Sequence, residues 1–422
     1  MEQRRALSRD YSWFSPILND KLSGVVADAV VWVESSEEME TVLRIAVENR
    51  IPLTARGGGT GNYAQSVPLY GGIVADTTRM NKKLEITEQG FAVADPGVRL
   101  KEIRDKAESM GYSLRVFPST YVTATLGGYL CGGSAGVGSV QYGDLWNGNV
   151  SSVQMLTPAL GSVEVSGRKL DGVIHAAGTT GLLTKATIPL TKEESFGGLI
   201  CSFASLREAL AFGKKVASSS QFRKRIVMLL EPKLASLFTN FKFPFDERGY
   251  NVMLVYSSAN EAVVRQTLRE NAPPPLHSTW IDESLANRLT DITFNHTTLW
   301  AKREEQNLTW ADLVFDLDRA EELITKIKGK LGESFLLHVE YALWRNQMVA
   351  WAFPLLYYKS MEDVQRILDY FNQIGVSRHD VHTVYVDDRL EPEKVATIVQ
   401  MKHAYDPHGI LNPGKIRAFQ PR

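Results

Sequence analysis

The stretch that decides the fold is Pro52-Leu53-Thr54-Ala55-Arg56-Gly57-Gly58-Gly59-Thr60-Gly61-Asn62. Residues 56–61 hold four glycines, one arginine and one threonine, directly after a short apolar run. Glycine adopts positive φ without a steric penalty and lets backbone N–H groups come close to a ligand. Consecutive N–H groups in such a turn form a concave site for anions. We interpret residues 56–61 as a phosphate-binding loop, with a plain glycine-rich turn as the alternative.

Spacing excludes two other phosphate-binding patterns. A Walker A loop requires Gly-x4-Gly-Lys followed by Ser or Thr, and no lysine follows this loop. The dinucleotide fingerprint requires Gly-x-Gly-x-x-Gly at the start of a helix. Here the loop continues into Tyr63-Ala64-Gln65-Ser66-Val67-Pro68, which does not begin a helix. Any phosphate bound here is held in another way.

Composition limits the class of protein. The chain of 422 residues is long enough for two or three domains, and 44% hydrophobic with 23% charged residues is ordinary for a globular protein. A net charge of −1 gives no electrostatic reason to bind nucleic acid or an anionic membrane. The two cysteines, Cys131 and Cys201, form neither a disulfide framework nor a metal-binding pattern.

Targeting signals are not visible in the sequence. The polar start, Met1-Glu2-Gln3-Arg4-Arg5, leads to no apolar segment of a signal peptide. No apolar run reaches the length of about 18 residues that spans a membrane. We therefore expect no transmembrane segment and a cytoplasmic location, with peripheral attachment to a membrane left open.

The periodicity of apolar residues predicts two regions. In the first, strands are expected at 28–33, 51–54, 72–76, 91–98, 150–156, 162–165 and 185–190, with helices after Ser36 and over 100–110. Near residue 195 glycine becomes rarer, which indicates a second α+β region. Helices are expected there at 205–218, 259–270, 319–330 and 392–403, and strands at 197–203, 252–256, 312–317 and 335–339.

A second glycine-rich segment, Thr125–Gly138, contains too many glycines for a helix at ordinary cost. It suits a backbone that lies flat against a large planar ligand. A flexible linker is the alternative, but the interspersed Leu126, Tyr129 and Leu130 indicate packing.

Four motifs, taken in order, resemble one family across nearly the whole chain. They are Arg56–Gly61 with Gly72–Asp76 and Met80-Asn81, Pro118-Ser119 with Thr125–Gly128, Gly178–Leu183, and Asp406–Lys415. Together they resemble the FAD-binding enzymes of the vanillyl-alcohol oxidase / p-cresol methylhydroxylase superfamily. Within it, the FAD-linked D-2-hydroxyacid dehydrogenases are the most similar, including the glycolate oxidase flavin subunit and D-lactate dehydrogenases.

The resemblance implies an α+β fold with three parts. These are a two-subdomain FAD-binding domain of the p-cresol methylhydroxylase type over 1–194, an α+β substrate (cap) domain over 195–390, and a C-terminal segment, 391–422, that returns to the flavin. The loop amides would hold the FAD pyrophosphate, and the later residues would line the ribityl chain, flavin or adenine. The implied cofactor-binding residues are Arg56, Gly57, Gly58, Gly59, Thr60, Gly61, Asn62, Pro118, Ser119, Thr125, Gly128, Ser134, Gly136, Gly181, Leu183 and Asn412.

FAD is expected to be noncovalent. Relatives that attach flavin covalently often use a histidine beside the pyrophosphate loop, and this loop contains none. Cys131 lies in the flavin region, but small buried cysteines are common, so we interpret it as a core residue.

Hydride transfer to flavin N5 requires a carboxylate anchor, a base for the hydroxyl proton and an aligned Cα–H. The segment Leu299-Trp300-Ala301-Lys302-Arg303-Glu304 resembles the Leu-Trp-x-x-Arg segment of the hydroxyacid dehydrogenases, whose arginine binds the substrate carboxylate. A guanidinium suits this task because it donates two parallel hydrogen bonds. Arg303 is the first candidate and Arg345 the second; a surface arginine is the alternative.

One departure from the family is clear. Members that use a metal carry His-x-Gly-Asp-Gly-Asn-x-His and a later Glu-His-Gly, whereas this chain has His338-Val339-Glu340 and His379-Asp380-Val381-His382. We therefore expect no metal, and the hydroxyacid substrate is itself in question. His338 and Glu340 alternate as strand residues that share one face. The base is expected among His338, Glu340, His379 and His382, with structural roles as the alternative.

Three functions follow from these motifs. The first is an FAD-dependent oxidoreductase that dehydrogenates a small hydroxylated substrate, most simply a 2-hydroxy acid, by hydride transfer to flavin N5. The second is a flavin-binding electron-transfer or structural subunit of a multi-protein oxidoreductase complex, without its own substrate site. The third is an oxidase of an alcohol or sugar in which Arg303 is structural. Expected partners are a small-molecule substrate and an electron-acceptor protein or partner subunit.

Overall fold

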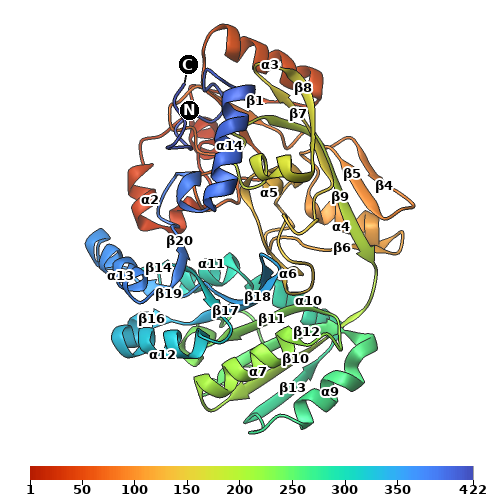
Figure 1. The fold of residues 1–422 in the computed structure, drawn as a ribbon, viewed down its shortest axis with the longest axis vertical. Coiled ribbons are helices and arrows are strands. Elements are labelled where there is room, and N and C mark those ends of the chain that lie inside the picture. Colours follow the sequence, from red (N-terminus) through yellow and green to blue (C-terminus); the bar gives the residue numbers. More distant parts are fainter. Residues whose placement is uncertain (422) are drawn as a thin grey trace. The chain divides into compact units, whose positions relative to one another are not determined.

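The computed structural model describes residues 1–421, whose contacts divide into two compact units (Figure 1). Unit 1 comprises Met1–Ser134, Leu145–Glu193 and the described part of Asp380–Arg422, and unit 2 comprises Ala135–Asp144 and Glu194–His379. Helices and strands are mixed in both, which confirms the predicted α+β class. The domain limits predicted from the sequence, 1–194, 195–390 and 391–422, remain predictions.

Unit 1 begins with a three-stranded parallel sheet in the order β1 (Ala29–Trp32), β3 (Ile73–Asp76), β2 (Leu53–Arg56). Helix α3 (Ser36–Glu48) starts where Ser35 Oγ accepts a hydrogen bond from the Glu38 N–H at 3.3 Å. Its buried side chains, with those of the sheet, form a core that also includes Leu156, Leu182 and Leu411.

Strand β2 begins and ends two residues later than predicted. Leu53 N–H donates to Ile410 O at 2.9 Å, and Asn412 N–H donates to Leu53 O at 2.8 Å. The C-terminal segment therefore pairs with this strand, which local periodicity in residues 51–54 could not reveal.

The second sheet of unit 1 has six antiparallel strands. Their order is β4 (Leu84–Ile86), β5 (Phe91–Ala94), β9 (Leu182–Lys192), β7 (Ser152–Thr157) and β8 (Gly161–Ser166), with β6 (Tyr112–Leu114) paired to β9. The helices of this unit are α1 (Glu2–Leu7), η1 (Tyr11–Phe14), α2 (Pro16–Lys21), α4 (Leu100–Glu108), α5 (Leu126–Gly132), η2 (Gly167–Gly172), η6 (Val386–Asp388) and α14 (Pro392–Tyr405).

Helix α5 shows that the non-helical prediction for Thr125–Gly138 was wrong in its first half. Thr125 caps the helix, because its Oγ1 accepts from the Gly128 N–H at 3.2 Å. Leu126, Tyr129 and Leu130 are buried, so tertiary packing offsets the cost of about 1 kcal/mol that each helical glycine adds. A Cβ on Gly127 would lie 2.7 Å from the Pro96 side chain, so glycine permits this close contact.

Unit 2 is built on an eight-stranded sheet whose neighbours pair antiparallel. The order is β13 (His277–Ile281), β10 (Phe196–Phe203), β12 (Tyr250–Ser257), β11 (Lys224–Leu230), β17 (His338–Trp344), β18 (Gln347–Ala352), β15 (Asp312–Asp316) and β20 (Ser377–His379). A smaller sheet joins β14 (Leu308–Trp310), β19 (Leu355–Tyr357) and β16 (Phe335–Leu336). The single strand predicted at 335–339 was wrong, because Leu337 separates β16 from β17 and the two belong to different sheets.

Helices cover both faces of the large sheet. Tyr341 Oη donates to Leu210 O at 3.3 Å, which places α7 (Leu206–Ser218) on one face of β17. Successive strand residues point to opposite faces, and Glu340 contacts the segment that leads into α11 (Asn295–Glu304), so α11 lies on the other. The remaining helices are α6 (Ser139–Tyr142), α8 (Pro232–Ala235), η3 (Ser258–Asn260), α9 (Glu261–Arg269), α10 (Glu283–Arg288), η4 (Leu289–Ile292), α12 (Ala320–Leu331), η5 (Gly332–Ser334) and α13 (Met361–Gln373).

The predicted helices at 205–218, 259–270, 319–330 and 392–403 are confirmed by α7, α9, α12 and α14. Within residues 1–421, none of the helices has both the length and the apolar character needed to cross a bilayer.

Candidate functional site

The glycine loop, residues 57–61, follows the carboxyl end of β2, the edge at which parallel sheets usually bind ligands. Its two ends are fixed by hydrogen bonds to carbonyl groups. Arg56 O accepts from Thr77 N at 2.8 Å and from Thr77 Oγ1 at 3.0 Å, and Gly61 O accepts from Tyr11 N at 2.7 Å. In a trans peptide the C=O and the following N–H point in opposite directions. The N–H groups of Gly57 and Asn62 therefore point away from Thr77 and Tyr11.

The loop offers unpaired backbone donors. Among the residues that the structure describes, none accepts a hydrogen bond from the N–H groups of Gly57 to Gly61. Backbone N–H groups require an acceptor in a folded protein, and a run of such groups in a turn attracts anions. The loop thus has the donor set that a diphosphate needs.

The loop packs against the second glycine-rich segment at distances that only glycine allows. A Cβ on Gly57 would lie 2.2 Å from Thr125 Oγ1, and one on Gly58 would lie 2.3 Å from Thr123 O. The N–H groups at the start of α5 are already paired: Leu126 N donates to Val98 O and Gly127 N to Pro96 O, both at 2.8 Å. The unpaired donors therefore belong to the loop and not to the helix N-terminus.

The Arg56 side chain supports the loop from the protein side. Its Nη1 donates to Arg9 O at 2.5 Å and to Ser66 Oγ at 3.2 Å. A Cβ on Gly59, whose φ is +66°, would lie 2.0 Å from Arg56 Nη2. Burial lowers the pKa of Arg56, while the nearby carboxylates of Asp10 and Asp76 act in the opposite direction. The Arg56 side chain therefore supports the loop, and its predicted cofactor contact stays a prediction.

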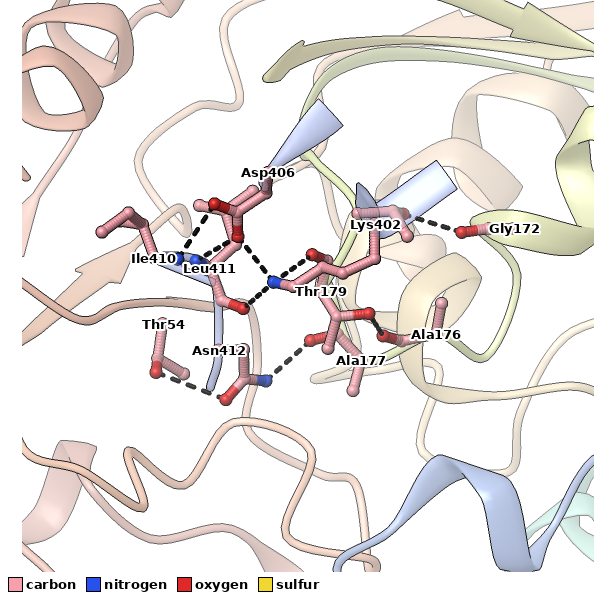
Figure 2. A network of polar contacts seen from close by, with 11 residues as sticks. Thr54, Gly172, Ala176, Ala177, Thr179, Lys402, Asp406, Ile410, Leu411 and Asn412 are labelled. Carbon is pink, nitrogen blue, oxygen red and sulfur yellow. Dashed lines mark hydrogen bonds and ion pairs between the residues drawn. The ribbon is translucent and has the colours of Figure 1, made fainter. Parts of the chain in front are cut away.

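Asn412 joins three segments of unit 1, and Figure 2 shows its contacts with Thr54 and Ala177. Its Nδ2 donates to Gln65 O and Ala177 O, each at 2.7 Å, and its Oδ1 accepts from Thr54 Oγ1 at 3.4 Å. Both amide hydrogens are thus used within the protein. The geometry shows a structural role, and the predicted contact of Asn412 with flavin stays a prediction.

The rest of the C-terminal motif is held in place by a buried ion pair (Figure 2). Lys402 Nζ lies 2.6 Å from Asp406 Oδ2 and donates to Thr179 O at 2.8 Å and Leu411 O at 2.6 Å. The two Asp406 oxygens accept from Ile410 N at 2.9 Å and Leu411 N at 2.7 Å. Burial lowers the pKa of Lys402, and Asp406 opposes that shift.

The other predicted cofactor residues lie in different places. Ser119 is buried, and Thr60 Oγ1 lies 3.3 Å from Thr120 Oγ1 in the turn beside it. A Cβ on Gly181 would lie 2.5 Å from Met155 Sδ, so Gly181 is fixed by packing. The remaining members of the set are Pro118, Ser134 and Leu183 in unit 1 and Gly136 in unit 2, where the Gly136 N–H donates to Ser139 Oγ at 3.0 Å.

In unit 2 the strand register gathers polar side chains on one sheet face. Glu340 pairs with Trp351 and Asp312 with His379, while Val314 also pairs with Trp351. Directly opposed residues share a face, as do residues two apart on one strand. His338, Glu340, Asp312, Trp351 and His379 therefore occupy the same face, which is the face toward α11.

His338 and Glu340 form a buried pair. His338 Nε2 lies 3.0 Å from Glu340 Oε1, and Phe294 N donates to the same oxygen at 2.8 Å. Because a carboxylate oxygen accepts, Nε2 is the donor of this contact, and in a neutral imidazole Nδ1 then carries the lone pair. His338 Nδ1 is buried and has no hydrogen-bond partner among residues 1–421. A buried polar atom without a partner is uncommon and marks a site for water or ligand.

Phe294 holds an unusual backbone conformation beside this pair. Its φ is +48° and its ψ is −133°, in a region that non-glycine residues rarely occupy. Such conformations persist when the surroundings enforce them, and they cluster at functional sites. The bond from Phe294 N to Glu340 is one contact that fixes this residue.

A second carboxylate–imidazole contact lies on the same face. Asp312 Oδ1 accepts from Trp351 Nε1 at 2.6 Å and lies 3.1 Å from His379 Nδ1. Asp312 was expected at the start of a strand and was not among the predicted site residues. The sequence feature that could have identified Asp312 is a carboxylate residue directly before the apolar run Leu313-Val314-Phe315.

The structure separates the remaining candidates. Arg303 lies in the last turn of α11, is exposed and stacks over the Trp300 ring at 4.0 Å, so its role as carboxylate anchor stays a prediction. Arg345 stacks over Trp344 at 4.2 Å. His382 belongs to unit 1, where its Nδ1 lies 2.8 Å from Ser15 Oγ.

Cys131 is half-buried, and desolvation raises the pKa of its thiol to about 12, so the thiol is protonated at neutral pH. Within the described chain, no three His, Cys, Asp or Glu side chains are grouped as metal ligands would be.

Two family models match the chain. An FAD binding domain matches residues 27–167, and the C-terminal domain of FAD linked oxidases matches residues 199–416. A D-lactate dehydrogenase of Archaeoglobus fulgidus is 24% identical over 92% of this chain and 90% of its own length. The glycolate oxidase subunit GlcD of Bacillus subtilis is 25% identical over 94% of this chain and 90% of its own length.

A solved structure of alkyldihydroxyacetonephosphate synthase has the same fold, with a TM-score of 0.71 and 18% identity over 92% of this chain and 77% of that one. The residues present fit FAD, because the loop presents unpaired amide donors and its glycines let the backbone pack closely against neighbouring segments. The resemblance drawn from the four motifs is confirmed. The chain belongs to the FAD-linked oxidases, and it is an oxidoreductase with FAD as its cofactor.

Proposed function

We propose that this protein dehydrogenates a small 2-hydroxy acid and that its FAD is bound noncovalently. Two relatives named for such activities, a D-lactate dehydrogenase and a glycolate oxidase subunit, align with more than nine-tenths of the chain. The observation that carries the proposal is the buried His338–Glu340 pair, which leaves His338 Nδ1 without a partner.

The chemistry divides between the cofactor and the side chains. When bound, FAD supplies the acceptor for the hydride that leaves the substrate α-carbon. His338 Nδ1 accepts the hydroxyl proton, as a general base does. Glu340 holds Nε2–H at 3.0 Å, which orients the ring and stabilises the imidazolium after protonation.

Substrate binding needs a cation for the carboxylate. Arg303 is the proposed anchor, because its guanidinium is exposed and held over the Trp300 ring. The stacked plane leaves the N–H groups at its edge free to form two parallel hydrogen bonds with a carboxylate. Asp312 and His379 are proposed to complete the polar face, with Asp312 orienting His379.

The cofactor is proposed to bind in unit 1. The backbone amides of residues 57–62 hold the diphosphate, and Pro118, Ser119, Thr125 and Gly128 line the adjoining surface. No histidine lies in the loop, so no imidazole is available there for a covalent link.

The test is anaerobic reduction of the bound flavin by a panel containing D-lactate, L-lactate, glycolate, D-2-hydroxyglutarate and simple alcohols. We expect one or more hydroxy acids to bleach the flavin absorbance, and His338→Ala to slow bleaching by about 10²–10⁴-fold. Arg303→Ala is expected to raise the hydroxy acid concentration needed for half-maximal rate. Bleaching by alcohols at least as fast as by hydroxy acids would contradict the proposal.

A second candidate is a flavin-binding electron-transfer or structural subunit. The B. subtilis relative is by name one subunit of glycolate oxidase, which favours this alternative. A flavin that no panel member bleaches, in a protein that co-purifies with other chains, would select it.

A further inference from the structure

The segment Ser8–Ser15, which we call the N-terminal clasp, is polar but buried. Ser8, Asp10, Ser12 and Ser15 are all at most 5% exposed. Short polar residues are usually exposed, so burial of four in one segment requires a packing or functional reason. The clasp precedes residue 27, where the match to the FAD-binding family begins.

The clasp contacts the glycine loop through backbone groups. Tyr11 N–H donates to Gly61 O at 2.7 Å, at the C-terminal end of the loop. Arg56, at the other end, donates from Nη1 to Arg9 O at 2.5 Å. Both ends of the loop are therefore tied to consecutive parts of one segment.

The clasp is itself anchored to distant parts of unit 1. Ser8 Oγ accepts from Ala27 N at 2.9 Å, and Ser15 Oγ lies 2.8 Å from His382 Nδ1. Asp10 Oδ1 accepts from Ser12 N at 3.0 Å, and its carboxylate interacts with the charges of Arg56 and Lys415. These contacts fix the position of the clasp within unit 1, so it can support the loop.

We propose that the N-terminal clasp is a positioning element of the FAD site, which holds the Gly61–Asn62 peptide so that the loop amides face the diphosphate before FAD arrives. The Gly61 carbonyl is bound on the clasp side, so the Asn62 N–H is directed to the opposite side. Without that bond the loop must be ordered when FAD binds, which weakens the apparent affinity. The clasp acts through Gly61 and Arg56, so it is not a catalytic element.

The decisive variant is Tyr11→Pro, compared with Tyr11→Ala. Both lack the tyrosine side chain, but only proline lacks the N–H that bonds to Gly61. Tyr11 begins η1, a position that tolerates the fixed φ of proline. Asp10 is already extended, with φ −132° and ψ −163°, as the residue before proline should be.

The measured quantity is the dissociation constant of FAD for the apoprotein, from quenching of FAD fluorescence in the absence of substrate. We expect Tyr11→Pro to bind FAD about tenfold more weakly than Tyr11→Ala, since a lost hydrogen bond of this kind is worth roughly a factor of ten. Equal dissociation constants for the two variants would overturn the proposal. Because no substrate is present, this result is independent of the proposed dehydrogenase activity.

A second measurement uses the parent protein and decides the question if Tyr11→Pro does not fold. Coupling between two sites is reciprocal, so FAD must stabilise the clasp if the clasp favours FAD binding. We expect the Tyr11 amide hydrogen to exchange with solvent more slowly in the FAD-bound protein than in the apoprotein. An exchange rate that FAD leaves unchanged would overturn the proposal as well.

Discussion

The glycine loop of unit 1 and the histidine–carboxylate face of unit 2 are built in opposite ways. The loop offers backbone amides and few side chains. The glycines at 57–59 lie so close to neighbouring atoms that a Cβ would not fit. The face of unit 2 uses imidazole and carboxylate groups that the register of four strands brings together. A backbone site is thus sensitive to added atoms, whereas a side-chain site is sensitive to changed chemistry.

The largest effect should follow from Gly58→Ala. A Cβ at this position would lie 2.3 Å from Thr123 O, a backbone atom that cannot rotate away. We expect FAD binding to weaken by more than about 10³-fold, as measured by retained flavin absorbance and by titration of the apoprotein. The matched control is Gly132→Ala, because a Cβ there would meet its nearest atom at 3.8 Å, an ordinary contact. Similar FAD affinity for the two variants would refute a backbone-built site.

Glu340→Gln should separate the two sites. The amide keeps an oxygen for Phe294 N but loses the charge that stabilises a protonated His338. We expect anaerobic flavin reduction to slow by about 10²–10³-fold with unchanged FAD affinity. Glu231→Gln serves as control, because Glu231 is a buried carboxylate of the same unit that pairs with Lys328 at 2.7 Å. Reduction at the parent rate by Glu340→Gln would remove this pair from the mechanism.

Asp406→Asn tests how much the buried ion pair of the C-terminal motif stabilises the folded protein. The variant leaves the Lys402 ammonium buried without its partner, which costs about 3–5 kcal/mol of unfolding free energy. Glu48→Gln breaks the Arg44 pair, which has the same i,i+4 spacing but is exposed, and should cost less than about 0.5 kcal/mol. Thermal or denaturant melts of the apoproteins test this difference. Equal losses from the two variants would contradict the structural role of the motif.

Lys415 should give an effect that builds up gradually with pH. Its Nζ donates to Ala64 O at 2.5 Å, and burial lowers its pKa from 10.5 to about 7. The unfolded chain keeps this proton up to its ordinary pKa, whereas the folded protein releases it near pH 7. Between these values the free energy of unfolding should rise by about 1.4 kcal/mol per pH unit from this group.

The comparison of the parent with Lys415→Met isolates that contribution. Denaturant unfolding at several pH values between 7 and 10 should show a steeper rise in the parent than in the variant. Parallel curves would mean that Lys415 stays charged in the folded protein.

The sequence revealed the loop more readily than the face of unit 2, for a physical reason. The glycines within residues 57–61 indicate a local backbone conformation, so the phosphate-binding interpretation needed no tertiary information. His338 and Glu340 could be placed on one face by alternation alone, and they do form a contact. Asp312 was missed because its proximity to His379 depends on the pairing of β15 with β20, which are far apart in the chain.

The errors have similar causes. Helix α5 was excluded on glycine propensity, but burial of Leu126, Tyr129 and Leu130 outweighs that preference. Strand β2 was placed too early because its partner, Leu411, lies near the other end of the sequence. The flavin contact of Asn412 is a different case and stays a prediction, because the structure shows only that its side-chain amide is bonded to two protein carbonyls.

The pairing of β2 with the C-terminal motif has a consequence for folding during synthesis. Thr54 and Asn412, which are bonded in the folded protein, are separated by 358 positions. At roughly 5–20 residues per second, a ribosome needs about 20–70 s to make the second after the first. During that interval the glycine loop lacks its contacts with the C-terminal motif, so we expect flavin binding to follow synthesis of residue 412.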